Sequence, residues 1–331
     1  QGSKLFEPMA QSGFLPLEKV YNWEPIPSEI KPEHRDKILG GQANLWAEYM
    51  PDYRQAEYMI YPRVLALSEV LWATHYRDYK NFTERLVEAQ QRLDYGGINY
   101  HIPLPEGPQA QYVEFVDSVE VTLANSLGYE IFYWTNQTNW TNWTSATNLF
   151  NTTLLRAYTT FNGRNSDTIE VYYNKLSAPH PAAKHLLHNG LYRQRAYGYF
   201  PNTDSLDYVR FDITDLVDSL IYDRNDTYFE PWIEVYQGYI KVDSTDSYLI
   251  TTDLEELWVD DIRVINNNGR LKRNQTQRAL MVLEEGFHSI KAVYNNCVND
   301  GFPAHWRKPE IRIKSLEEKE FRVLRPKDFY R

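Results

Sequence analysis

A tryptophan and a glutamate stand two positions apart at Trp46 and Glu48, after a glycine-interrupted apolar run that begins at Ile38. A carboxylate only accepts hydrogen bonds, and its charge strengthens them. An indole presents a flat apolar face that can lie against a sugar ring. A core tryptophan beside a surface glutamate is nevertheless the commoner arrangement, so the two residues alone leave both interpretations open.

Histidine and cysteine supply few other candidate ligands. The eight histidines show no metal-ligand spacing such as His-x-x-x-His, and His180, His185 and His188 follow a proline-rich stretch. We therefore expect these three to be solvated loop residues rather than a zinc site. The single cysteine, Cys297, excludes an internal disulfide and a cysteine-based zinc site. The expectation is a protein with no metal and no cofactor.

Length and charge narrow the class of protein. The 331 residues have room for two or three domains, with 42% apolar and 24% charged residues. A net charge of −10 without a basic stripe makes nucleic acid an unfavourable partner. No run approaches the roughly 18 apolar residues that a membrane-spanning helix needs. No signal peptide is visible at the first residues, Gln1 to Lys4.

Helical signals fill residues 1–104. Pro62 stands where the first turn of a helix over Arg63–Trp72 tolerates a proline. A second helix has Asn81 as its expected N-cap and the pair Gly96–Gly97 as its end. Ahead of both helices, Ile38–Trp46 begins as a buried strand would and then leads into a loop.

Beyond a proline-rich linker the hydrophobic period changes to two. Short alternating runs separated by turns predict all-β structure in residues 105–177 and again in residues 178–331. The repeat at residues 135–144, TNQTNWTNWT, is typical of a lengthened hairpin loop. Aromatic residues make up 15% of the chain, which favours strands, although such residues also line sugar-binding surfaces.

Four motifs in the first region occur in a characteristic order and spacing. They are Pro16–Tyr21 (PLEKVY), Gly40–Tyr49 (GGQANLWAEY), Glu57–Met59 (EYM) and Tyr61–Trp72 (YPRVLALSEVLW). They resemble the end of the catalytic domain of glycoside hydrolase family 20, the β-N-acetylhexosaminidases. The resemblance implies the last strand and helices of a (β/α)8 barrel, with active residues at the carboxy ends of the strands.

That family implies a role for both residues considered first. By resemblance, Trp46 forms a wall of the pocket for the terminal N-acetylated sugar, and Glu48 accepts hydrogen bonds from its 4- and 6-hydroxyls. The family's catalytic residues are an adjacent Asp–Glu pair on an earlier strand, which work with the substrate's own acetamide. This sequence contains no Asp–Glu dipeptide. The chain is therefore expected to carry no catalytic residue.

The later regions resemble two β-sandwich modules. Tyr129–Thr135 and Phe161–Ser166 are similar to an immunoglobulin-like domain, which implies no catalytic role. Gly238–Val242 and Leu257–Asp261 are similar to the protective-antigen-type sandwich of glycosidases and adhesins.

Sugar-binding members of the protective-antigen type hold calcium with two adjacent aspartates, where this sequence has Thr252–Asp253 followed by Leu254. The expectation is a solvated acidic edge, with a calcium site as the less favoured alternative. The acidic residues concerned are Asp253, Glu255, Glu256, Asp260 and Asp261.

The fold class expected from these patterns is multidomain. Residues 1–104 form the end of a (β/α)8 barrel, and residues 105–177 and 178–331 form two all-β sandwiches. The expected function is that of a fragment of an exo-β-N-acetylhexosaminidase acting on N-acetylhexosamine-containing glycans, in an extracellular, periplasmic or lysosome-like location. The alternative is a non-catalytic carbohydrate-binding or spacer protein that carries a barrel remnant.

Overall fold

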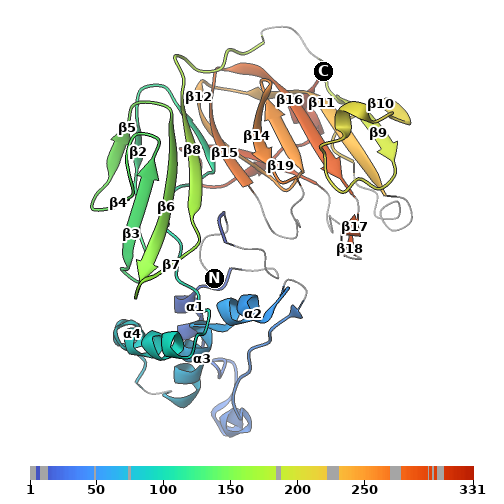
Figure 1. Cartoon of the computed structure of the whole chain (residues 1–331). Helices are drawn as coiled ribbons and strands as arrows, with labels where there is room; N and C mark the ends of the chain where they lie inside the picture. The colour runs from blue at the N-terminus through green and yellow to red at the C-terminus, as the bar shows by residue number, and fades with distance from the viewer. Residues whose placement is uncertain are drawn as a thin grey trace.

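The chain divides into a helical end and a larger β-rich body (Figure 1). The computed structural model describes residues 5–7, 14–47, 50–73, 76–183, 188–221, 231–268, 277–296, 298–299, 302–303 and 309–331. Within these ranges no helix is both long and apolar enough to cross a membrane.

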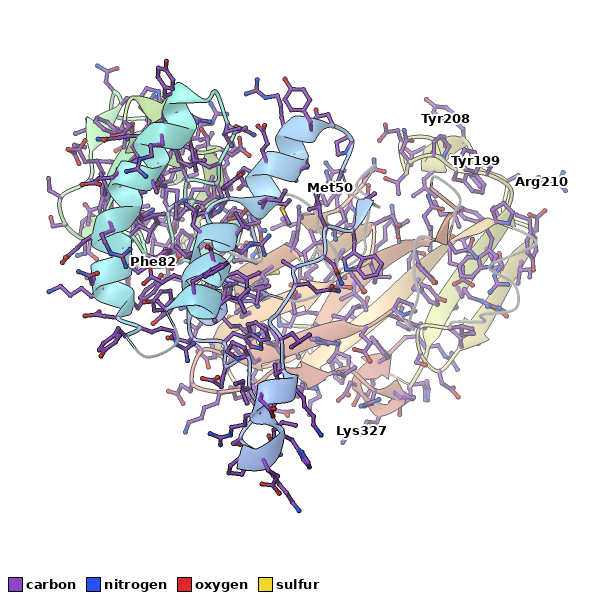
Figure 2. All side chains as sticks on the ribbon, turned by 90° about the horizontal axis from the view of Figure 1, so that it is seen from below. Met50, Phe82, Tyr199, Tyr208, Arg210 and Lys327 are labelled. Atoms are coloured by element: carbon purple, nitrogen blue, oxygen red, sulfur yellow. The ribbon has the colours of Figure 1, made fainter. Side chains whose placement is uncertain are left out.

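Four α-helices form the helical end. They are α1 (Leu17–Tyr21), α2 (Tyr53–Ile60), α3 (Arg63–Trp72) and α4 (Tyr79–Tyr95), with a 3-10 helix at Pro32–Lys37. The sequence prediction for α3 is confirmed, with Pro62 directly before its first residue. The helices share a small core around Tyr21, Phe82 and Leu86 (Phe82 is labelled in Figure 2).

Helix α4 ends as predicted and begins differently. Gly96 follows its last residue, and Gly97 has a φ of +70°, a left-handed conformation that favours glycine. Its N-cap is Asp78, whose carboxylate accepts a hydrogen bond from the backbone N–H of Asn81 at 3.2 Å. The prediction of Asn81 as the cap was wrong because the helix starts two residues before it.

A ten-stranded sheet forms the centre of the β-rich body. Its order is β20 (Arg322–Val323), β19 (Ile311–Ser315), β12 (Asp246–Thr252), β15 (Gln277–Leu283), β1 (Tyr112–Phe115), β8 (Ile169–Lys175), β6 (Thr153–Phe161), β3 (Glu130–Thr135) and β4 (Thr141–Asn142), with β7 (Arg164–Asn165) on β6. Strand β1 runs parallel to both of its neighbours, and the other pairs are antiparallel.

A seven-stranded antiparallel sheet packs on one end of the larger sheet. It contains β10 (Ile213–Val217), β9 (Leu191–Tyr197), β11 (Trp232–Val242), β16 (Gly286–Asn295), β13 (Glu256–Val259) and β14 (Ile262–Asn266), with β21 (Phe329–Tyr330) on β11. Two small sheets pair β2 (Val119–Val121) with β5 (Thr147–Leu149) and β17 (Val298–Asn299) with β18 (Phe302–Pro303). The β-sandwich character predicted after residue 105 is confirmed.

The ten-stranded sheet crosses the expected boundary at residue 177. Tyr112 of β1 stands opposite Tyr172 on one side and Ala279 on the other. Two hydrophobic cores lie on the sheet: one between the two large sheets, around Trp232 and Ile250, and one under β2, around Ile131 and Val171. The two regions thus share one sheet, and the second core also takes in Leu249 and Leu280 from the later region.

Candidate functional site

Residues 38–46, the segment that ends in Trp46, form neither a helix nor a strand. Leu39 is 96% exposed and Trp46 is 58% exposed. The prediction of a buried strand was therefore wrong, and the end of a (β/α)8 barrel is not confirmed. A parallel barrel strand is buried only when strands flank both of its edges and helices cover it. In the part of the chain that the structure describes, no strand pairs with this segment.

Gly41 holds this segment against the helices. A Cβ atom built at Gly41 would lie 2.7 and 2.9 Å from ring atoms of Trp23 and 3.3 Å from Cδ2 of Leu71. Carbon atoms do not approach so closely without a shift of the neighbouring residues, so the contact requires glycine. The close approach of Gly41 to the indole fixes the start of the segment that carries Trp46.

A polar network supports the helices beneath the segment. The hydroxyl of Tyr21 donates to Glu69 Oε1 at 2.8 Å and accepts from the backbone N–H of Asp78 at 2.8 Å. Arg85 Nη2 lies 2.8 Å from both carboxylate oxygens of Glu69. Burial, together with the bond to Glu69, raises the pKa of Tyr21, so the hydroxyl remains a donor at neutral pH.

Glu48 lies outside the described residues, so its role as a sugar ligand stays a prediction. Ala47, which follows Trp46, is exposed, and α2 begins six residues after Ala47, at Tyr53. Trp46 is accessible to a ligand, as a pocket wall must be. The segment therefore presents at least one of the two expected groups to solvent.

A buried acid–histidine pair, not anticipated from the sequence, lies beside α2. Glu7 Oε1 is 2.8 Å from Nε2 of His101, and Glu7 Oε2 accepts from the hydroxyl of Tyr58 at 2.7 Å. Burial lowers the pKa of His101, so we describe it as a neutral ring that donates its Nε2 proton. Burial also acts to raise the pKa of Glu7, but the hydrogen bond from His101 acts against it, and the pKa of Glu7 lies below its usual range. Tyr58 and His101 lie 51 and 94 residues after Glu7, so no local sequence pattern predicts this cluster.

The acidic residues near β13 do not form the solvated edge that the sequence predicted. Asp253, Glu255 and Glu256 are all buried. Glu256 accepts from Thr203 Oγ1 at 2.6 Å and from Trp258 Nε1 at 3.0 Å. Because Glu256 depends on Thr203 and Glu255 on the backbone N–H of Asn295, both far along the chain, their burial has no signature in the local sequence.

Asp260 and Asp261 form the turn between β13 and β14, both with positive φ, of 47° and 65°. Asp260 Oδ2 lies 2.6 Å from Nδ1 of His288, and Asp260 Oδ1 accepts from the backbone N–H of Ser289. Asp261 is exposed. Among the described residues, no three His, Cys, Asp or Glu side chains converge as metal ligands do.

His180 departs from the prediction of a solvated loop histidine. Its Nε2 lies 2.8 and 2.9 Å from the two carboxylate oxygens of Glu114, which is fully buried on β1. Tyr112 and the backbone N–H of Val282 also donate to this carboxylate. The bond to Glu114 raises the pKa of His180. His188 is exposed, as expected, and His185 lies outside the described residues.

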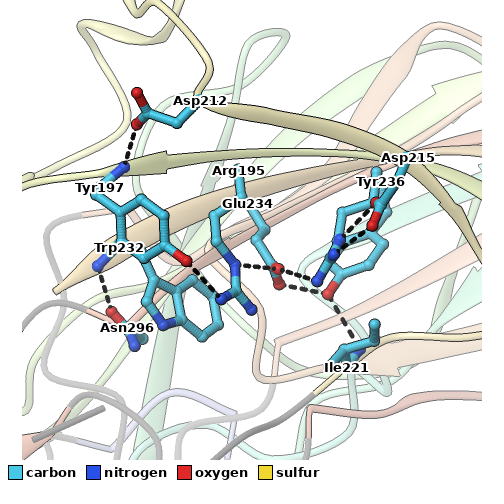
Figure 3. Close-up of polar contacts among 10 residues, drawn as sticks. Arg195, Tyr197, Asp212, Asp215, Ile221, Trp232, Glu234, Tyr236 and Asn296 are labelled. Atoms are coloured by element: carbon cyan, nitrogen blue, oxygen red, sulfur yellow. Dashed lines mark hydrogen bonds and ion pairs between the residues drawn. The ribbon is translucent and has the colours of Figure 1, made fainter. Parts of the chain in front are cut away.

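The largest cluster of buried charge lies between the two large sheets (Figure 3). Glu234 Oε1 accepts from Arg195 Nε at 2.8 Å and from Arg193 Nη1 at 3.1 Å, and the hydroxyl of Tyr236 donates to its other oxygen. Arg193 also forms a two-pronged pair with Asp215. Each oxygen of Glu234 and Asp215 has a donor, so these groups link β9 to β10 and β11 and are best explained as a structural network.

Comparison with known proteins assigns the first part of the chain. Residues 1–75 match the sequence model of the glycosyl hydrolase family 20 catalytic domain. The β-hexosaminidase of Porphyromonas gingivalis is 31% identical over 345 residues, covering 98% of this chain and 44% of that protein. The chitooligosaccharidolytic β-N-acetylglucosaminidase of Ostrinia furnacalis is 35% identical over 95 residues, covering 29% of this chain and 16% of that protein. The chain thus spans less than half the length of these relatives.

Similarity to solved structures is low. The PA14 sugar-binding domain from an RTX adhesin is 13% identical, with a TM-score of 0.34 over 43% of this chain and 98% of that one. A TM-score of this size does not establish a shared fold, so the protective-antigen-type assignment stays a prediction. The sequence matches carry the classification instead: residues 1–75 match glycoside hydrolase family 20, and the whole chain is similar to a β-hexosaminidase.

Proposed function

We propose that this chain is the carboxy-terminal part of an exo-β-N-acetylhexosaminidase. The protein would remove terminal N-acetylglucosamine or N-acetylgalactosamine from glycans, with retention of configuration. The observation that carries the proposal is the 31% identity to a β-hexosaminidase, which extends through both β-rich regions to 98% of this chain. Glycans outside the cytoplasm are its expected partners.

We propose that the residues that cleave the bond precede this chain, while this chain contributes residues that hold the sugar. In substrate-assisted hydrolysis a glutamic acid protonates the leaving oxygen, while the substrate's acetamide oxygen attacks the anomeric carbon and an aspartate orients that acetamide. No adjacent Asp–Glu pair occurs in these 331 residues. The exposed apolar run at residues 38–45 supports the same view, because no strand among the described residues flanks and buries it.

Within the complete protein, Trp46 and Glu48 would hold the sugar that is released. The indole would stack on the apolar face of the ring, and the carboxylate would accept from its 4- and 6-hydroxyls. A hydrogen bond to a charged group contributes about 1.5–3 kcal/mol. Binding at this edge is remote from the bond that breaks, so it can be used to position and distort the reacting ring.

The test compares this chain with a longer form of the protein that includes the residues before Gln1. Both are assayed with an aryl N-acetyl-β-glucosaminide. The longer form should turn over the substrate, and the 331-residue chain should not exceed a buffer blank. Turnover by the repurified 331-residue chain would contradict the proposed division. An inactive longer form would favour the non-catalytic carbohydrate-binding or spacer protein instead.

A further inference from the structure

The two faces of the ten-stranded sheet are covered at opposite ends. The seven-stranded sheet covers the face of β12 and β15 that carries Ile250 and Met281. The opposite face, at β3, β6 and β8, carries Ile131, Leu155 and Val171 into the second core. The remaining face of β3, β6 and β8 belongs to neither core.

Aromatic side chains line that remaining face. Phe132 and Trp134 alternate with the core residues of β3, and Tyr158 of β6 stands directly opposite Phe132. The rings of Phe132 and Tyr158 lie 5.8 Å apart at 15°, and Trp140 lies 4.7 Å from Tyr158. None of the four belongs to either core among the described residues. We call Phe132, Trp134, Trp140 and Tyr158 the aromatic platform.

The repeat at residues 135–144 explains how the platform is extended. It forms the predicted lengthened hairpin between β3 and β4. Trp140 and Trp143 are separated by an odd number of positions, so an extended chain directs them to opposite faces. Trp143 packs edge-on against Tyr133 beside the second core, whereas Trp140 lies against Tyr158 and remains 44% exposed.

Polar groups border the platform: an ion pair with no net charge, the amide of Asn142 and, at the exposed end of β3, Glu130. Arg156 lies over the ring of Trp134 at 5.4 Å and pairs with Glu170 across the strands at 2.7 Å. Asn142 stands opposite Phe132 on β4, with its amide on the same face. Because the guanidinium and the carboxylate neutralise each other, the face suits an uncharged partner that offers both donors and acceptors.

We infer that the aromatic platform binds an uncharged pyranose oligosaccharide. Pyranose rings present apolar C–H faces that stack on aromatic rings, and hydroxyls at their edges that bond to amides, guanidinium groups and carboxylates. Several neighbouring rings on a flat strand face match several consecutive sugars rather than a single terminal one. The site lies on β3, β6 and the hairpin after β3, in residues 105–177, and functions without catalysis.

The test measures binding of N-acetylchitohexaose and of cellohexaose to the 331-residue chain by isothermal titration calorimetry. At least one hexasaccharide should bind. Trp140→Ala should weaken that binding about tenfold or more, as expected for loss of a stacking ring, whereas Trp140→Phe should retain most of it. Tyr95→Ala is the matched control, because Tyr95 is 98% exposed at the end of α4, away from the platform.

A second variant separates this site from the proposed catalytic pocket. The part of the hexasaccharide binding that Trp140→Ala removes should persist in Glu48→Gln. The inference is overturned if neither hexasaccharide binds at millimolar concentration, or if Trp140→Ala binds as tightly as the native chain. It is also overturned if Glu48→Gln abolishes the binding while Trp140→Ala preserves it. Each result is independent of whether the longer protein hydrolyses an aryl glycoside.

Discussion

The guanidinium of Arg164 lies 3.0 Å from the carboxylate of Asp94 and so joins β7 to the last turn of α4. The same Nη1 donates to the carbonyl of Ile98 at 2.8 Å, and Nη2 donates to Asn99 Oδ1 at 3.2 Å. The guanidinium also lies 4.6 Å from the ring centroid of Tyr100. One arginine of the sandwich thus fixes the chain where it leaves the helices.

Arg164→Met should loosen the helical end while the sandwich stays folded. Methionine keeps the length of the side chain and removes its donors, at an expected cost of about 1–2 kcal/mol for this partly exposed cluster. Cleavage by a protease within residues 14–100 should then accelerate roughly 5- to 30-fold, because it follows the population of the open state. Mass spectrometry of a timed digest gives the rates.

Arg156→Met is the control for that digest. Arg156 also pairs with a carboxylate, but both partners are exposed, at 45% and 55%, and exposed pairs contribute little. Its digestion rate within residues 14–100 should match that of the native chain. Equal rates for native and Arg164→Met proteins would mean that Arg164 does not hold the helical end in place.

The pair of His180 and Glu114 should make stability depend on pH. The pKa of His180 is raised in the folded protein by the bond to Glu114. A raised pKa means that the folded state holds the proton more tightly, so the stabilisation is complete below the unfolded pKa of about 6.5. It is lost as pH rises through the higher folded value. Urea unfolding across this range should show the fall.

His180→Gln should flatten that part of the pH profile, because glutamine can donate to Glu114 but does not titrate. His188→Gln is the matched control, since His188 lies eight residues further along the chain and is exposed. The control should keep the native profile. If His180→Gln kept the native slope above pH 6.5, the titrating group would be another residue.

The turn at Asp260 and Asp261 allows a comparison of two aspartates with similar backbone and different contacts. Both have positive φ, which glycine adopts without strain. Asp260→Gly should destabilise the protein by about 1.5–3 kcal/mol, because it loses the charge-assisted bonds to His288 and to the N–H of Ser289. Asp261→Gly should change stability by less than about 0.5 kcal/mol. Thermal unfolding of both variants measures these changes in stability, and equal losses of stability would contradict the role given to the contacts of Asp260.

Local signals in the sequence predicted the elements well. Pro62 marked the start of α3, and Gly96 and Gly97 marked the end of α4, because both residue types limit the backbone locally. Alternating apolar residues predicted strands such as β11 and β16. These patterns depend only on neighbours along the chain.

Long-range pairing could not be predicted in the same way. The parallel pairing of β1 joins it to β8, 60 residues away, and to β15, more than 160 residues away, and no local pattern encodes it. The burial of Glu114 and Glu256 depends on donors from distant segments, Val282 of β15 and Thr203. The prediction of a buried strand at Ile38 was wrong although the local composition suits one. The described residues supply no strand beside it.

The most direct measurement for the proposed function is the kcat/KM of Glu48→Gln in the longer, active form of the protein. Glutamine keeps the shape and one acceptor oxygen but loses the charge, for an expected loss of about 1.5–3 kcal/mol. That corresponds to a drop of roughly ten- to a hundredfold in kcat/KM for an aryl N-acetyl-β-glucosaminide. Because this binding is remote from the reacting bond, kcat should fall as well as KM rise. Glu18→Gln, at an exposed position on α1, should remain within about twofold of native. If Glu48→Gln also stayed within about twofold of native, Glu48 would not hold the sugar and the proposed site would be wrong.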